Sequence, residues 1–355
     1  MDVGIQLFFN NFEDGRTDRD VWKEDVEVAS WAEPMGLDFI SGVEHHFHSY
    51  AVSPDNVSFL SYMAAKTKRI KLMTGAVILP WNDPVRVTER MIQLDHLSGG
   101  RVLFGMGRGL ARREYERFGV DMNESRGRFD EAAKMITRAL ETGILESDGP
   151  YYRRAPLEIR PKPFASFKGR TACVAMSSDS VPICAELGAA MMCFASKPWD
   201  QMASQVDTYN SLYDKYHKTA RPKPIFTNFM FCDESQDRAA EMAHTYMGNY
   251  YDDLMVHYEI AGTHWKAIKG YGDYASGSEE LAKLNSYEAG KAAYVQVNDF
   301  GTPNRILEEY ERRRKLLGEF DMLLCVAYGG MKLGDIEKSM RLYTQKVLPE
   351  LKSWH

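Results

Sequence analysis

A cluster of histidines is the first part of this sequence that could carry out chemistry. Glu44, His45, His46 and His48 follow directly on an apolar run. Adjacent residues of a strand point to opposite faces, so His45 and His46 would face different ways. An imidazole can act as a general acid or base near neutral pH, or it can be a structural histidine bonded to Glu44. No HExxH pattern accompanies the cluster, so the sequence predicts no metal site.

Two further segments could bind an anion. In residues 105–110, three glycines expose backbone amides and Arg108 adds a cation. Residues 176–180 offer serine hydroxyls and free amides just before a predicted helix. Each has a simpler interpretation, a plain turn for the first and a helix cap for the second. Because they follow neighbouring predicted strands, they could also converge on one phosphate. The glycine spacing is not GxGxxG, so a dinucleotide-binding fold is not supported.

Small residues end the third predicted strand, at Thr74, Gly75 and Ala76. They would allow a flat ligand to approach the backbone closely, or else tight packing of a helix on a strand. The pattern alone leaves both interpretations open. Nearby on the chain, the charged residues 112–117 favour an i,i+4 ion-pair face of a helix.

Strand-like runs alternate with helix-like segments, which predicts a parallel sheet of α/β class. The predicted strands are residues 3–9, 37–43, 70–79, 101–104, 172–176, 190–195, 224–231 and 322–328. This arrangement favours a closed (β/α)8 TIM barrel spanning residues 1–355 as a single domain. In such a barrel the active site forms from the loops at the carboxyl ends of the strands.

Two stretches interrupt the alternation. Residues 146–170 predict an inserted loop or hairpin, and residues 262–300 predict a long irregular loop, either a mobile lid or an inert surface segment.

The composition excludes several classes of protein. The 355 residues carry a net charge of −6 and no basic stripe, which argues against a nucleic-acid partner. The basic run of residues 312–315 lies among glutamates and predicts a solvated helix face. The five cysteines form no CxxC pair, and no apolar stretch reaches membrane-spanning length. We therefore expect a cytoplasmic protein with no membrane contact.

The same strand ends resemble a known family, the bacterial-luciferase-like flavin-dependent monooxygenases, above all their catalytic α subunits. The similarity runs nearly end to end, and its short motifs keep the family's order and spacing. They are Glu44-His45-His46-Phe47, Leu94-Asp95-His96-Leu97-Ser98-Gly99-Gly100-Arg101, Gly107-Arg108-Gly109-Leu110 and the segment from Arg117 to Arg126.

The resemblance implies an activity and its partners. Members of the family are (β/α)8 barrels that bind FMN, which a separate NAD(P)H:flavin reductase supplies in reduced form. Oxygen adds to the reduced flavin, and the resulting flavin peroxide attacks a substrate such as an aldehyde. The resemblance also implies a homodimer, paired through helices beside the second and third strands, and a mobile lid over residues 262–300.

The resemblance assigns roles residue by residue. His45 corresponds to the catalytic histidine, and Arg108 to the arginine that holds the flavin phosphate. Ser177, Ser180 and the backbone amide of Met176 correspond to further phosphate contacts. Gly75-Ala76 matches a non-prolyl cis peptide under the flavin ring. Gly107 replaces a reactive cysteine and Tyr250 a tryptophan, both beside the flavin, so the substrate should differ from that of luciferase.

Other functions remain open at this point. A deazaflavin-dependent oxidoreductase shares the fold, non-catalytic flavin-binding proteins occur in the family, and an unrelated barrel enzyme could bind a phosphorylated substrate. Aromatic residues expected at the rim suggest a small apolar or aromatic substrate. These are Phe8, Phe47, Phe194, Tyr250 and Trp265.

Overall fold

The chain folds into a closed barrel of eight parallel strands, as the alternating pattern predicts. The computed structural model describes residues 1–12, 15–283 and 287–354. The barrel strands are β1 (Val3–Leu7), β2 (Phe39–Gly42), β3 (Lys71–Thr74), β5 (Val102–Gly107), β8 (Thr171–Val174), β9 (Ala190–Phe194), β10 (Ile225–Cys232) and β12 (Asp321–Cys325). Pairing of β1 with β12, in which Val3 lies opposite Met322, closes the ring. All eight predicted strands are confirmed.

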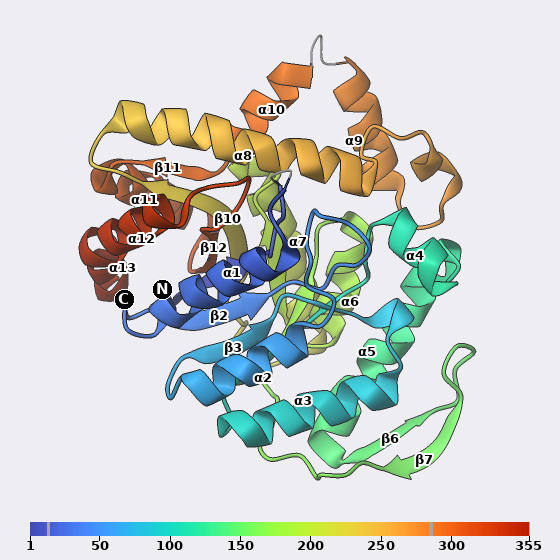
Figure 1. Ribbon diagram of the computed structural model, residues 1–355. Coiled ribbons are helices and arrows are strands. Elements are labelled where there is room, and N and C mark those ends of the chain that lie inside the picture. Colours follow the sequence, from blue (N-terminus) through green and yellow to red (C-terminus); the bar gives the residue numbers. More distant parts are fainter. Residues whose placement is uncertain (13–14, 284–286, 355) are drawn as a thin grey trace.

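Helices surround the barrel (Figure 1). They include α1 (Asp18–Ala32), α2 (Asn56–Lys66), α3 (Pro84–Ser98), α4 (Arg112–Phe118), α5 (Ser125–Thr142), α6 (Val181–Glu186), α7 (Trp199–Tyr216), α8 (Gln236–Tyr258), α11 (Pro303–Leu317), α12 (Leu333–Lys346) and α13 (Leu348–Ser353). Local sequence sets their ends. The side chain of Asp83 accepts from the Val85 and Arg86 amides ahead of Pro84, and Gly99 ends α3 in the left-handed conformation.

The strands carry apolar side chains on both faces, as expected for a parallel sheet covered by helices. One cluster of buried residues comprises Phe39, Met73, Ala76, Ala172, Ala190, Met192, Ile225 and Leu323, most of them on barrel strands. The strands β1 and β2 approach each other closely at Gly4 and Phe39. Position 4 requires glycine, because a Cβ atom there would lie 2.4 Å from the Cβ atom of Phe39.

The insertion after α5 is a hairpin. The strands β6 (Ile144–Ser147) and β7 (Arg154–Glu158) pair antiparallel, apart from the barrel sheet. The Glu131 carboxylate of α5 accepts hydrogen bonds from the Ser147 hydroxyl and from the amides of Tyr151 and Tyr152, which anchors the hairpin to the helix layer.

The prediction of an irregular loop over residues 262–300 is wrong for the described part of that stretch. It contains a short turn (His264–Ala267), α9 (Gly272–Lys283), α10 (Tyr287–Gln296) and β11 (Asp299–Gly301), which pairs with β10. Residues 284–286 lie outside the described chain. Glycine and serine favour loops locally, but burial of Trp265 and Tyr271 against Tyr115 of α4 outweighs that weak preference. Movement of this segment as a lid stays a prediction.

The prediction of a solvated basic face over residues 312–315 is also wrong at one position. Arg313 is buried, forms an ion pair with the buried Asp299, and lies 4.1 Å from the centre of the Trp199 ring. Its neighbour Arg312 is exposed, as predicted, and it pairs with Glu309. The helix therefore turns one arginine of the run inward.

Loss of the buried arginine should destabilise the fold far more than loss of its neighbour. Arg313→Met leaves the Asp299 carboxylate buried without its cation, which costs about 3–5 kcal/mol. Arg312→Met removes an exposed pair worth roughly 0–1 kcal/mol. Urea unfolding of both variants measures the difference, and equal midpoints would show that the inner pair contributes nothing special.

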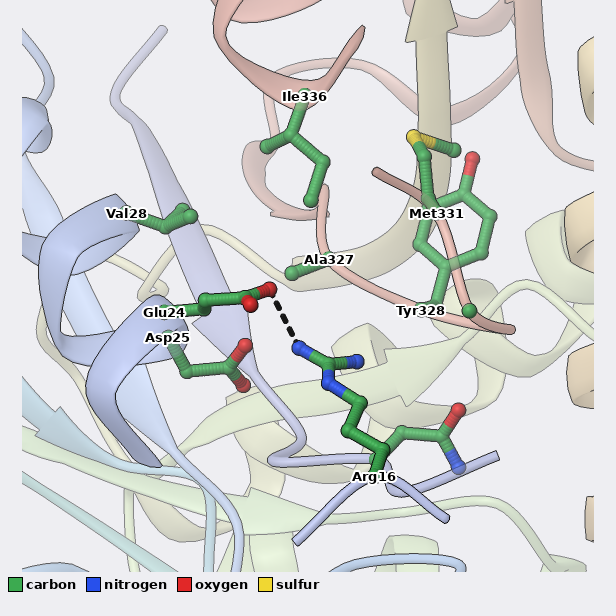
Figure 2. A pocket seen from close by; sticks show the side chains of 10 residues that line it. Arg16, Glu24, Asp25, Val28, Ala327, Tyr328, Met331 and Ile336 are labelled. Atoms are coloured by element: carbon green, nitrogen blue, oxygen red, sulfur yellow. Dashed lines mark hydrogen bonds and ion pairs between the residues drawn. The ribbon is translucent and has the colours of Figure 1, made fainter. Parts of the chain in front are cut away.

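A second buried carboxyl group belongs to Asp25 of α1, beside a small pocket between α1 and the loop after β12 (Figure 2). Arg16 and Glu24 form an ion pair at this pocket. The Asp25 carboxylate accepts from the Phe9 amide at 2.8 Å. Burial raises its pKa from 3.8 to about 7, although the Phe9 bond and the nearby Arg16 act in the opposite direction.

This shift makes stability depend on pH. Between pH 3.8 and about 7 the folded state holds a proton on Asp25 that the unfolded state has lost. The free energy of unfolding therefore falls as the pH rises through this window. Asp25→Asn keeps an acceptor for the Phe9 amide and should flatten the dependence between about pH 4 and 7 in thermal unfolding. Glu27→Gln, at an exposed position of α1, is the control, and an unchanged slope in Asp25→Asn would contradict the assignment.

Candidate active site

The loop after β2 places His45 between two partners from distant elements. Its Nδ1 lies 3.1 Å from Oε1 of Glu114 in α4, and its Nε2 lies 3.1 Å from the Tyr258 hydroxyl at the end of α8. The same Glu114 oxygen accepts from the His46 amide at 2.7 Å. An ionised carboxylate can only accept, so Nδ1 carries a proton, and in the neutral imidazole Nε2 accepts from Tyr258.

His46 turns away from His45, although both lie in the loop after β2 (Phe39–Gly42) and strand alternation does not apply to them. Its Nε2 lies 3.3 Å from Glu44, and its ring packs edge-on against Phe118 at 4.7 Å. Glu44 also accepts from the Trp81 indole and the Asn82 amide, both at 2.8 Å. The histidine bonded to Glu44 is therefore His46, and the catalytic role of His45 stays a prediction.

Sequence reasoning missed Glu114 by placing it in an exposed ion-pair face. Its side chain is buried, and its carboxylate contacts His45, His46 and His257. The i,i+4 pair on that helix is instead Arg112 with Glu116.

His257 completes a cluster behind His45. It is buried near the end of α8, and the Tyr50 ring stacks on it at 4.4 Å. Burial, together with the nearby His45, His48 and Arg113, holds its pKa far below the usual range, so it is neutral. Ligand atoms of His45, Glu114 and His257 all lie within 4.8 Å of one another, a spacing that a metal ion could bridge. The predicted absence of a metal stays a prediction.

Arg126, at the start of α5, links the two predicted anion segments. Its Nη2 donates to the Ser180 hydroxyl at 2.8 Å, and Ser180 bonds to the Ser177 hydroxyl at 2.9 Å. Burial and repulsion from Arg108 lower its pKa. Its buried Nε has no hydrogen-bond partner among the described residues. Two neighbouring guanidinium groups beside two hydroxyls, called the anion cradle below, could hold a dianion, and the sequence pattern did not single out Arg126 as a ligand.

The segment before α9 covers this cradle. Nη1 of Arg108 donates to the Gly270 carbonyl at 2.7 Å, and the guanidinium lies 3.9 Å from the centre of the Tyr271 ring. The Ser178 amide and hydroxyl donate to the Asp273 carboxylate at 2.7 and 3.2 Å. Figure 1 shows α9 beyond the end of α8 and next to α4. The stretch predicted to be a lid therefore contacts the predicted anion site directly.

The peptide bond between Gly75 and Ala76 is cis, as the resemblance implies. The Gly75 carbonyl accepts from the Gln6 amide group at 2.8 Å, and the Ala76 carbonyl from Asn56 at 3.1 Å. A Cβ atom on Gly75 would lie 2.3 Å from the Ser41 hydroxyl, so only glycine fits. The predicted strand 70–79 is thereby split into β3 and β4 (Val77–Ile78).

Gly107 lies beside this turn, since a Cβ atom there would be 3.4 Å from that of Ala76. Small residues from two strands thus meet in one place. At the end of β8, the Met176 sulfur accepts from the Phe194 amide of β9 at 3.0 Å, which ties this loop to the neighbouring strand.

Tyr250 lies deeper among aromatic side chains. Its ring packs against Phe229 at 4.4 Å and edge-on to Phe8 at 5.1 Å, and its hydroxyl bonds to that of Tyr50. Tyr50 and Tyr258 carry no sequence motif, so nothing in the pattern pointed to them. Their place in the site follows from contacts between residues about two hundred positions apart.

Comparison with known proteins identifies the family. Residues 1–319 match the family model described as luciferase-like monooxygenase, so the chain belongs to this family. It is 26% identical to the alkanal monooxygenase alpha chain of Photobacterium leiognathi over 342 residues, which cover 95% of this chain and 96% of that protein.

Solved structures share the fold. The monooxygenase RslO1 from Streptomyces bottropensis superposes with a TM-score of 0.80 at 24% identity, covering 99% of this chain and 100% of that one. The oxygenating constituent of 3,6-diketocamphane monooxygenase from Pseudomonas putida, solved in complex with FMN, gives 0.76 at 18%, with 99% and 98% covered. An F420-dependent secondary alcohol dehydrogenase gives 0.72 at 16%, with 98% of both chains covered.

Among the described helices, none combines the length and the apolar character needed to cross a membrane.

Proposed function

We propose that this chain is an FMN-dependent monooxygenase that uses reduced FMN and O2 to oxidise a small apolar or aromatic substrate. The observation that carries the proposal is the cradle of Arg108, Arg126, Ser177 and Ser180, which fits a phosphate dianion. A family member solved with FMN supports the choice of cofactor.

The residues present fit the cofactor. The unpartnered Nε of Arg126, the Arg108 guanidinium, the two serine hydroxyls and the Met176 backbone amide would hold the phosphate. Gly75, Ala76 and Gly107 offer a surface without long side chains for the flat ring, and Tyr250 would lie beside it. When bound, reduced flavin supplies the electrons that allow oxygen to react with an organic substrate.

The chain's own acid–base group is His45. Glu114 fixes the proton on Nδ1, so Nε2 is the atom that takes or gives a proton. Burial of Trp265 and Tyr271 over the anion cradle would exclude water from the reaction, a recognised role of site closure. Proton transfer in a dry pocket requires an oriented imidazole and a covered site. Glu114 would orient His45, and the segment with Tyr271 would cover the site.

Partners follow from the family. We propose a separate NAD(P)H:flavin reductase as the source of reduced FMN, and a cytoplasmic homodimer paired through α2 and α3. The exposed side chains of Tyr62 on α2 and Leu97 on α3 support that surface. Phe8, Tyr50, Phe229 and Tyr250 form an aromatic cluster next to His45, which supports an apolar or aromatic substrate.

A deazaflavin-dependent oxidoreductase is the second candidate, because F420-dependent enzymes share the fold at similar TM-scores. Anaerobic titration with reduced FMN, followed by rapid mixing with oxygen, separates the two. Tight binding and a long-lived absorbing species distinct from oxidised FMN would support the monooxygenase. Failure to bind reduced FMN, with binding of the reduced deazaflavin, would contradict it.

Arg108→Ala should weaken FMN binding much more than riboflavin binding, because only FMN carries the phosphate. A hydrogen bond to a charged group contributes about 1.5–3 kcal/mol, which corresponds to roughly a 10- to 150-fold loss of affinity. Titration of both flavins by fluorescence quenching measures the ratio. Arg341→Ala, on the exposed face of α12, is the control, and equal losses for FMN and riboflavin would remove the phosphate role of Arg108.

His45→Ala should retain flavin affinity and lose oxygenation, since the general acid–base group contributes roughly 10²- to 10⁴-fold. Glu114→Gln keeps the size of the side chain but no longer fixes the Nδ1 proton, so it should also slow turnover. Glu116→Gln, on the exposed face of the same helix, is the matched control. Turnover is measured on the first substrate found by screening, and an unchanged rate in His45→Ala would exclude His45 from the mechanism.

A further inference from the structure

Side chains from three distant elements meet beside the loop after β2. His45 of that loop, Glu114 of α4 and His257 of α8 each offer a nitrogen or oxygen atom, and these atoms all lie within 4.8 Å of one another. Oε1 of Glu114 lies 3.1 Å from Nδ1 of His45 and 3.8 Å from Nε2 of His257. Imidazole nitrogens and carboxylate oxygens are common ligands of Zn²⁺.

His257 is the member of this group that lacks a partner. Its side chain is fully buried, and neither ring nitrogen has a hydrogen-bond partner in the described part of the chain. The Tyr50 ring stacks on it at 4.4 Å with an angle of 9° between the planes, which fixes the orientation of the imidazole. Because buried polar atoms are seldom left without a partner, the open nitrogens of His257 indicate a place for a ligand.

The spacing of the three side chains suits a metal ion. Zn²⁺ binds nitrogen and oxygen at about 2.0–2.2 Å, and in a tetrahedral site neighbouring ligand atoms are then about 3.4 Å apart. The two distances from Glu114, 3.1 and 3.8 Å, lie on either side of this value. The imidazoles of His45 and His257 are nearly perpendicular, at 85°, with centres 5.0 Å apart. Three protein ligands leave the fourth position of the ion to water.

Outer contacts already hold two of the ligands in place. The His46 amide donates to Oε1 of Glu114 at 2.7 Å, and the Tyr258 hydroxyl lies 3.1 Å from Nε2 of His45. At metal sites such contacts orient the ligands and select the histidine tautomer. With an ion on Nδ1 of His45, the ring proton would lie on Nε2 and would be donated to the Tyr258 oxygen.

We propose that His45, Glu114 and His257 bind a divalent transition-metal ion of the zinc type, and that the ion inhibits the enzyme by occupying His45. The ion enters from solvent at His45, whose side chain is 13% exposed. Nδ1 gives its proton up and coordinates the ion, while Nε2 takes a proton and can accept no other. No electron is transferred, and the Glu114 carboxylate balances part of the added charge. The binding is independent of the proposed function, whereas the inhibition rests on it.

No sequence motif predicts this site, because its ligands come from a loop and two helices that are distant in the chain. The histidines of the loop after β2 lack the HExxH pattern, and His257 carries no motif of its own. Only the fold brings the carboxylate and the second imidazole to His45.

The first measurement is titration of the flavin-free protein with Zn²⁺, and with Co²⁺, whose visible absorption reports its ligands. We expect one ion at this site in each chain. His257→Leu removes one ligand and should weaken binding by more than the roughly 10- to 100-fold that loss of an outer contact costs. His244→Leu, at an exposed position of the same helix, is the matched control and should bind as the wild type does.

The second measurement needs no variant at the site and therefore does not depend on how His257→Leu folds. In flavin-free wild-type protein with ¹⁵N-labelled histidine, Zn²⁺ should move the Nδ1 resonance of His45 and the Nε2 resonance of His257. The resonances of His244 should stay in place.

The third measurement follows turnover with chemically reduced FMN and oxygen, so that no reductase is exposed to the metal. Zn²⁺ should inhibit the wild-type enzyme, and a chelator should restore its rate. His257→Leu should turn over without metal and lose this sensitivity, and His244→Leu should remain sensitive.

Three results would overturn the proposal. The first is equal affinity for Zn²⁺ in His257→Leu and the wild type, and the second is a wild-type spectrum in which the resonances of His45 and His257 do not move. The third is full turnover with Zn²⁺ bound at the site. Failure of the wild-type protein to bind reduced FMN would instead contradict the proposed function, whereas the first two measurements need no flavin and decide the metal site independently.

Discussion

The site depends on the hydrogen bonds of the Glu114 carboxylate. This carboxylate is buried, and one of its oxygens accepts hydrogen bonds from Nδ1 of His45 and from the backbone amide of His46. This arrangement ties the loop after β2 to α4, orients the imidazole and decides which nitrogen carries the proton. In the neutral imidazole, the Tyr258 hydroxyl then donates to Nε2. The Glu114 carboxylate therefore determines the direction of the hydrogen bond between His45 and the end of α8.

The anion cradle differs from the Glu114 site because it brings two groups of like charge together, the guanidinium groups of Arg108 and Arg126. Arg108 and Arg126 lie close enough to lower the pKa of Arg126. Such a pair is stable with an anion between its members, and otherwise each guanidinium needs a substitute acceptor. Arg108 takes the carbonyl of Gly270 and the face of Tyr271. The covering segment thus satisfies the arginine with neutral groups, which a phosphate, as a stronger acceptor, can outcompete.

Sequence patterns predicted the elements well and the long-range contacts poorly. Apolar runs placed all eight strands, and Asp83-Pro84 with Gly99 marked both ends of α3, because such signals are local. Glu114 lies 69 residues from His45, and Tyr258 lies 213 residues away. No periodicity of the sequence predicts that residues so far apart in the chain are in contact. Composition misled at residues 262–300 and at Arg313, where tertiary packing decides the conformation and the burial.

Unsatisfied polar groups reveal how the fold prepares for ligands. Burying a donor or acceptor without a partner is costly, so proteins retain few of them. Here Nε of Arg126 belongs to the cradle, and the Ser41 hydroxyl and Gln6 Oε1 lie beside Gly75. The Tyr50 and Tyr250 hydroxyls, by contrast, bond to each other. Open polar groups thus lie at the predicted anion site and beside Gly75, whereas both ring nitrogens of His45 already have partners. The packing of the barrel offsets the cost of the open groups.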